Sequence, residues 1–174
     1  VMDPRSGNVL AYQAPITVSG ESLNDSGYQP GSLLSPFAAV AAFARGYSPS
    51  SLLWDIPGST TVNQQSGTEY HGAVNIRGAV ANDYLIPIAA LINNVGPANG
   101  WLTASAAGLS SLGDAANDAS PLATDAETSL LDIGAAYSTL ANSGVRSGVR
   151  DPLNSRISPN TILRAVTSSG RELI

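Results

Sequence analysis

One segment constrains the fold more than any other. Residues 37–44, with the sequence FAAVAAFA, form an uninterrupted apolar run. Ser35 is a natural helix N-cap, Pro36 is a favoured first helical residue, and Gly46 is a typical helix end, so the run predicts one helix. Because this helix is apolar on nearly every side, it has to be buried in a larger body.

The residue types that are missing exclude several chemistries. The 174 residues include no lysine, no cysteine and a single histidine, His71, and the eight basic residues are all arginines. The lack of lysine excludes a P-loop lysine, a Schiff base and a Ser–Lys pair, and the lack of cysteine excludes thiolate nucleophiles and cysteine metal sites. One histidine cannot build a multi-histidine centre. We therefore expect no metal and no cofactor.

Charge and hydropathy restrict the partners. The net charge is −5 and the arginines are scattered, which argues against a nucleic-acid surface and against binding to anionic membranes. The longest apolar runs, residues 38–44 and 85–92, are far shorter than the roughly 20 residues of a membrane span. A hydrophobic content of 43% with only 12% charged residues predicts a globular domain with a neutral, polar surface. The chain starts with Val1 and has no leader pattern, so we expect a segment of a longer protein.

Turn residues and apolar spacing predict further elements. Ser129 and Asp132 form a capping pattern in front of an apolar helical stripe that ends at residues 142–144. Apolar residues in 74–95 have helical spacing in two pieces, broken at Pro87 and closed by Gly96. The other predictions are a hairpin over 1–12, an exposed connection over 13–31, loops over 47–72 with at most one strand near 59–63, a helix over 99–107, and a hairpin over 161–174 with its turn at 168–170.

Five segments, in order, resemble the transpeptidase domain of penicillin-binding proteins, particularly the class linked to a glycosyltransferase. They are residues 3–11 (DPRSGNVLA), 29–37 (QPGSLLSPF), 77–87 (RGAVANDYLIP), 129–145 (SLLDIGAAYSTLANSGV) and 162–173, and they are distributed along most of the chain. The resemblance implies a mixed α/β (α+β) fold in which helices flank an antiparallel sheet, incomplete and formed by a single partial domain over residues 1–174. It also implies that the helix after Ser32 is central.

The same resemblance identifies the positions that would carry chemistry. In that family a lysine one turn after the nucleophilic serine accepts its proton, and a Ser-x-Asn pair and a Lys-Thr-Gly strand complete the site. By resemblance Ser32 occupies the nucleophile position and Ser35 that of the lysine, while a Lys-Thr-Gly strand is missing from the sequence. Asp83 stands for the second serine and Leu85 for the asparagine. A hydroxyl cannot replace the amine base.

Three functions follow as hypotheses. The first is a non-catalytic transpeptidase-like domain that acts as a structural or protein-interaction module, located outside the cytoplasm and tethered to the membrane through regions beyond this sequence. The second is an active serine D,D-transpeptidase or carboxypeptidase of peptidoglycan synthesis with Ser32 as nucleophile and Asp83 or His71 as base. The third is a module that binds glycan or stem peptide without turnover.

The expected partners follow from the same comparison. In the family the first hairpin pairs with strands that lie beyond residue 174, so we expect open sheet edges. Another protein, or the remaining part of the chain, would cover them, and a peptidoglycan stem peptide is a second candidate partner.

Other residues have simpler interpretations. His71 lies in a loop-like stretch, where a structural or exposed role outweighs a catalytic one. Arg77 fits a carboxylate clamp or a structural ion pair equally well. A group of acidic residues lacks the spacing of a calcium loop and predicts a solvated loop: Asp114, Asp118, Asp125 and Glu127. Six aromatic residues are expected to cover a core or a protein contact rather than to stack on glycan: Tyr12, Tyr28, Tyr47, Trp54, Tyr84 and Trp101.

Overall fold

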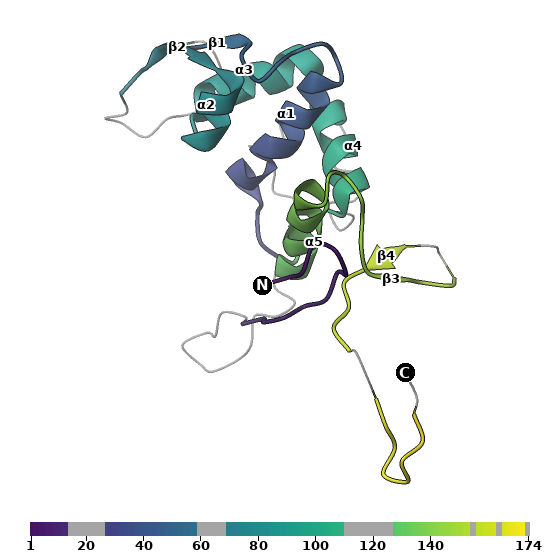
Figure 1. The fold of residues 1–174 in the computed structure, drawn as a ribbon. Coiled ribbons are helices and arrows are strands. Elements are labelled where there is room, and N and C mark those ends of the chain that lie inside the picture. Colours follow the sequence, from purple (N-terminus) through teal and green to yellow (C-terminus); the bar gives the residue numbers. More distant parts are fainter. Residues whose placement is uncertain (14–26, 59–68, 110–126, 154–155, 163–164, 173–174) are drawn as a thin grey trace. The chain divides into compact units, whose positions relative to one another are not determined.

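Helices and short antiparallel strands make up the structure, a computed structural model that describes residues 1–13, 27–58, 69–109, 127–153, 156–162 and 165–172 (Figure 1). In chain order the elements are η1 (Gly31–Leu34, a 3-10 helix), α1 (Ser35–Phe43), β1 (Leu52–Asp55), β2 (Gly72–Asn75), α2 (Ile76–Ala81), α3 (Leu85–Val95), α4 (Pro97–Ala107), α5 (Leu130–Ala141), β3 (Val149–Arg150) and β4 (Ile157–Ser158). β1 pairs with β2 and β3 pairs with β4, both antiparallel. The mixed α/β fold class predicted from the sequence is confirmed.

The chain divides into two compact units, which are described one at a time. The helical unit comprises Tyr28–Ala106 and Ser110–Thr128, and the terminal unit comprises Val1–Gly27, Ala107–Leu109 and Ser129–Ile174. Among the described residues, no helix has the length and apolar character that a membrane span requires. Residues 14–26, 59–63, and three of the four acidic residues considered above lie outside the described part, so the predictions for them are not tested.

The apolar run forms helix α1, and it is largely buried. Phe37 and Ala42 have no exposed surface, which confirms the burial expected from the sequence. The predicted capping role of Ser35 is wrong, because η1 runs directly into α1 and Leu34 occupies the N-cap position without any side-chain capping bond. The Ser35 backbone N–H donates instead to the Ser32 carbonyl oxygen, so this N–H needs no capping side chain.

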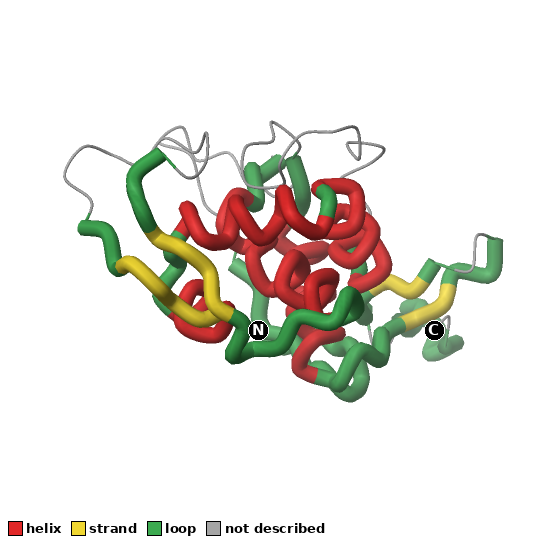
Figure 2. Tube along the Cα trace, turned by 90° about the horizontal axis from the view of Figure 1, so that it is seen from above, coloured by secondary structure: helices red, strands yellow, loops and turns green. Residues whose placement is uncertain are grey.

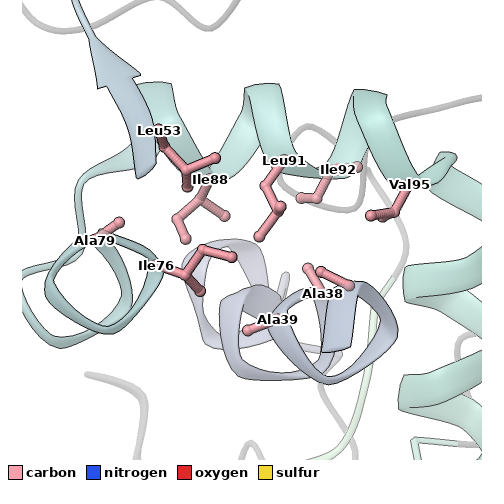
Figure 3. Packing of buried hydrophobic residues seen from close by; sticks show 10 residues of the cluster. Ala38, Ala39, Leu53, Ile76, Ala79, Ile88, Leu91, Ile92 and Val95 are labelled. Carbon is pink, nitrogen blue, oxygen red and sulfur yellow. The ribbon is translucent and has the colours of Figure 1, made fainter. Parts of the chain in front are cut away.

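The core of the helical unit lies between α1 and α3 (Figure 3). Helix α1 contributes only alanines to it, and small side chains let a neighbouring helix approach closely. Helix α3 fills the space with Ile88, Leu91, Ile92 and Val95, and Leu53 of β1 closes the core from the side. Figure 2 shows the two strands of the β1–β2 hairpin next to the helices.

Strands β1 and β2 differ from the elements predicted for this part of the sequence. β1 forms within 47–72 but outside the predicted 59–63, and β2 includes Val74 and Asn75, which helical spacing assigns to a helix. Asn75 decides the change from strand to helix, because its side chain accepts a hydrogen bond from the Gly78 N–H at 2.7 Å and caps α2.

The predicted break at Pro87 is also wrong. The break lies at residues 82–84, and Pro87 is the third residue of α3. A proline is tolerated there because N–H groups in the first turn have no partner within the helix. Helix α3 ends before Gly96, as predicted, and α4 confirms the helix expected over 99–107.

In the terminal unit the predicted first hairpin is present as a bridge between Met2 and Val9. The Ser6 hydroxyl and the Arg5 backbone N–H donate to the Asp3 carboxylate, and these hydrogen bonds hold the pKa of Asp3 below its ordinary value. Gly7 supplies the positive φ that the turn needs. The hairpin is therefore shaped by its own sequence.

The rest of the terminal unit contains the best-predicted helix. α5 starts after Ser129, whose hydroxyl accepts a hydrogen bond from the Asp132 N–H at 3.0 Å, so the predicted cap is confirmed. Near the C-terminus, Val166 and Glu172 form an antiparallel bridge around a turn at 168–170, as expected. The short β3–β4 ladder was not predicted, because two-residue strands leave no alternating pattern in a sequence.

Candidate functional site

Ser32 and Ser35 lie on consecutive turns of the η1–α1 segment. Ser32 is half-buried in η1, and Ser35, the first residue of α1, is 2% exposed. Among the described residues, neither hydroxyl takes part in a hydrogen bond, although the Ser35 hydroxyl is fully buried. A buried hydroxyl without a partner loses its solvation and gains nothing in return. At the position that the resemblance assigns to the lysine, Ser35 therefore places an uncharged hydroxyl that has no hydrogen-bond partner among the described residues.

The other two positions taken from the resemblance lie at the start of α3. Asp83 is exposed and has left-handed backbone geometry with φ of 55°, and its side chain forms no hydrogen bond with any described residue. Leu85 is the first residue of α3 and is half-buried. Because leucine cannot donate a hydrogen bond, it cannot do the work of an asparagine amide. Within the described residues, no hydrogen bond joins this turn to Ser32 or Ser35.

A buried carboxylate pairs with the single histidine. Asp55 is 1% exposed, and its Oδ2 accepts a hydrogen bond from the His71 backbone N–H at 3.2 Å and lies 2.7 Å from His71 Nδ1. Its second oxygen, Oδ1, is buried without a hydrogen-bond partner in the described part of the chain. The pair joins the two ends of the connection between β1 and β2, since Asp55 ends β1 and His71 precedes β2.

The imidazole of His71 is also held by an aromatic contact. Its ring stacks on Tyr84 with centroids 4.0 Å apart and an interplanar angle of 18°. A carboxylate on Nδ1 fixes this nitrogen as the donor and leaves Nε2 as the acceptor of the neutral ring, the arrangement that prepares a general base. The His71 side chain is 36% exposed, and no serine hydroxyl of the described residues is hydrogen-bonded to it. The carboxylate and the stacked ring thus fix the orientation of the imidazole.

Asp55 is the site residue that the sequence analysis missed. The signal that could have found it is the alternation in β1, where Leu53 and Asp55 are buried and Leu52 and Trp54 are exposed. A carboxylate on the buried face of a strand needs a partner. The sequence offers many polar partners, and only the antiparallel register, with Asp55 opposite Gly72, selects His71.

We expect Asp55→Ala to lower the free energy of unfolding by about 2–3 kcal/mol, because the change removes a buried acceptor of two His71 groups and leaves a small cavity. Chemical denaturation measures the loss. Asp55→Asn, which keeps one acceptor oxygen, is expected to lose about 1 kcal/mol. The exposed Glu69→Gln serves as the control, and an Asp55→Ala variant as stable as this control contradicts a stabilising role for the pair.

The remaining candidates take different places. Arg77 is exposed and has no acidic partner within the described residues, so the ion-pair interpretation is not supported there. Trp101 is buried and Tyr47 packs against the core, as expected of aromatics that cover a core, whereas Trp54 is exposed on the outer side of β1. The described residues contain no cluster of three His, Asp or Glu side chains that could hold a metal ion.

Comparison with known proteins supports the fold. No family model and no curated protein sequence matches the chain. Among solved structures, the chain is similar to the penicillin-binding protein PonA1 from Mycobacterium tuberculosis, with a TM-score of 0.78 and 24% identity over 99% of this chain and 47% of that chain. A structure of the same protein in complex with penicillin V gives a TM-score of 0.78 and 24% identity over 99% of this chain and 48% of that one.

These values concern the fold. The chain spans about half the length of the PonA1 chains that it matches. The resemblance drawn from the sequence motifs is therefore confirmed in three dimensions. This chain has the fold of part of a penicillin-binding protein.

Proposed function

We propose that the chain is a non-catalytic, penicillin-binding-protein-like transpeptidase domain that acts as a structural or protein-interaction module at the cell envelope. The observation that carries the proposal is the buried Ser35 hydroxyl, which has no partner among the described residues and stands where the resemblance expects the family's lysine. Attack by a serine hydroxyl needs a group that takes up its proton, and Ser35 cannot do so. Ser32 therefore remains an unactivated alcohol.

The surroundings of Ser32 support the same conclusion. Stabilisation of a developing oxyanion needs donors or positive charge aimed at the reacting centre. Asp83 brings a negative charge to the second motif and Leu85 an apolar side chain, so neither supplies what is needed. The Asp55–His71 pair has a base of the right chemistry, but within the described residues it is not hydrogen-bonded to Ser32.

An interaction role is supported by apolar surface and open strand edges. In each of the two sheets formed by the described residues, both strands are edge strands, which can pair with another chain. The terminal unit also has a mainly apolar groove of about 570 Å³ between its first hairpin and α5, lined by Val9, Tyr12, Leu130 and Tyr137 among others. Another protein, or further chain of the same fold, would cover such surface, and a stem peptide is the second candidate ligand.

Labelling with a fluorescent penicillin tests the proposal. We expect no covalent band on a denaturing gel under conditions in which an active penicillin-binding protein is fully labelled, because no base of the described residues is hydrogen-bonded to Ser32. Ser32→Ala is the matched control, and its background should equal that of the unchanged chain. A stable band that disappears in Ser32→Ala would instead establish the active serine transpeptidase or carboxypeptidase.

A further inference from the structure

A second groove lies in the helical unit, between α1 and α2. Its volume is about 430 Å³, and its walls include Val40 and Phe43 of α1, Val80 and Ala81 of α2, and Pro49. Every residue that lines it is apolar except Arg77. A pocket of this size, with apolar walls and one polar group, is typical of ligand sites.

The two residues that α1 exposes most in this groove are apolar. Most of this helix is buried, yet Val40 is 39% and Phe43 is 37% exposed, and both side chains line the groove. Neighbouring large apolar side chains that remain in contact with water gain free energy when another apolar surface covers them. Contiguous exposed apolar surface is one feature of interaction sites.

Arg77 gives the groove its charge. Its backbone N–H donates to the Pro49 carbonyl oxygen at 3.1 Å, which fixes the first turn of α2 against the groove wall. The guanidinium group is exposed and forms no hydrogen bond or ion pair with any described residue. The chain carries thirteen acidic residues, but none in the described part pairs with this cation. The complement of the groove is thus an apolar group with a carboxylate, which a guanidinium binds through two parallel hydrogen bonds.

We propose that this groove binds a short segment of a partner protein that inserts apolar side chains between α1 and α2 and pairs a carboxylate with Arg77. This inference rests on the interaction role proposed above and names a site for it. Nine residues line the groove, whereas a stable interface between folded proteins uses about 20–30 residues on each side, so a peptide segment fits better than a second copy of the chain.

Peptide binding tests the assignment. The probes are short, end-blocked, fluorescently labelled peptides with two leucines and one glutamate at varied spacing, each matched by a version with glutamine for glutamate. At least one spacing should bind saturably, with a Kd of roughly 10–500 μM, and its glutamine version should bind about five- to tenfold more weakly. Fluorescence anisotropy reports both affinities.

The protein variants then locate the binding. Arg77→Gln should lower the affinity for the glutamate peptide by the same factor, because the charge pair is gone. The variant protein should then bind the glutamate and glutamine versions with equal affinity. Val40→Glu should weaken both versions more than tenfold, since it places a carboxylate on the apolar wall. Leu102→Glu, an equal change at a position that is 64% exposed on α4 and does not line the groove, should bind normally. Circular dichroism checks that each variant is folded.

Three results would overturn the inference. They are no saturable binding by any spacing up to about 1 mM, equal affinity for the glutamate and glutamine versions, and Val40-dependent binding to phosphatidylglycerol vesicles in place of peptides. Penicillin labelling is independent of all three. Penicillin labelling of Ser32 would refute the proposed function. If no peptide binds and Ser32 is not labelled, only the proposed peptide site is refuted.

Discussion

Leu91→Ala is expected to lower the free energy of unfolding by about 3–4 kcal/mol, because Leu91 is fully buried and the cavity left behind cannot close. Leu91 points from α3 toward α1, whose contribution to the core is Ala38, Ala39 and Ala42 (Figure 3). Alanines have no rotamers that could move into the vacated space. Most of the lost packing energy therefore remains lost.

Chemical denaturation of the two proteins, followed by circular dichroism, measures the difference. Leu102→Ala is the matched control, since Leu102 is mostly exposed and should change stability by less than about 0.5 kcal/mol. Hydrogen exchange should show the loss of protection in α1 and α3, which share this core. A Leu91→Ala protein as stable as the control would contradict the packing of these two helices.

Gly7→Ala is expected to lower the free energy of unfolding of the terminal unit by about 2–4 kcal/mol, for two separate reasons. The first is the backbone, because φ at Gly7 is 75°, a conformation that a side chain disfavours by about 1 kcal/mol. The second is space. A Cβ atom at Gly7 would lie 2.5 Å from the Ser147 carbonyl oxygen, which is a backbone atom and cannot rotate away.

Gly170→Ala separates the two reasons. Gly170 also has a positive φ, 83°, but a Cβ atom there would meet nothing within 4 Å, so we expect a loss of about 1 kcal/mol. The additional loss of unfolding free energy in Gly7→Ala, compared with Gly170→Ala, measures the effect of the steric clash. It should loosen the contact in which Gly7 accepts a hydrogen bond from Asn160, visible as faster exchange of the Asn160 amide. Equal losses for the two variants would contradict the close approach of the first hairpin to Ser147.

Local sequence signals predicted the elements that depend on a few neighbouring residues. The Ser129 cap, the apolar stripe of α5 and the positive φ of Gly7 were all predictable because each involves residues within about one or two turns. Ser35 shows the limit of such signals. Its sequence context is that of an N-cap, but the preceding turn is itself helical and takes over the start of the helix.

Strands were predicted less well than helices. β1 and β2 are four residues each, and their pairing spans the connection from residue 56 to residue 71. A segment as short as Leu52–Asp55 has no unambiguous period, so pairing with another strand decides that it becomes a strand. Apolar spacing starts the predicted helix at Val74, whereas in the structure Val74 belongs to β2 and α2 begins at Ile76, after the N-cap Asn75.

The features of the candidate site also differ in whether the sequence or the tertiary structure determines them. The sequence by itself determined that no lysine side chain of these 174 residues can serve as a base for Ser32. It also determined the buried helix after Ser32, since residues so uniformly apolar have no other stable place. The tertiary structure alone decided that Asp55 meets His71 and that Arg77 borders an apolar groove between two helices. These contacts join residues far apart in the chain, and the free energy that selects them comes from packing and register, which local patterns do not encode.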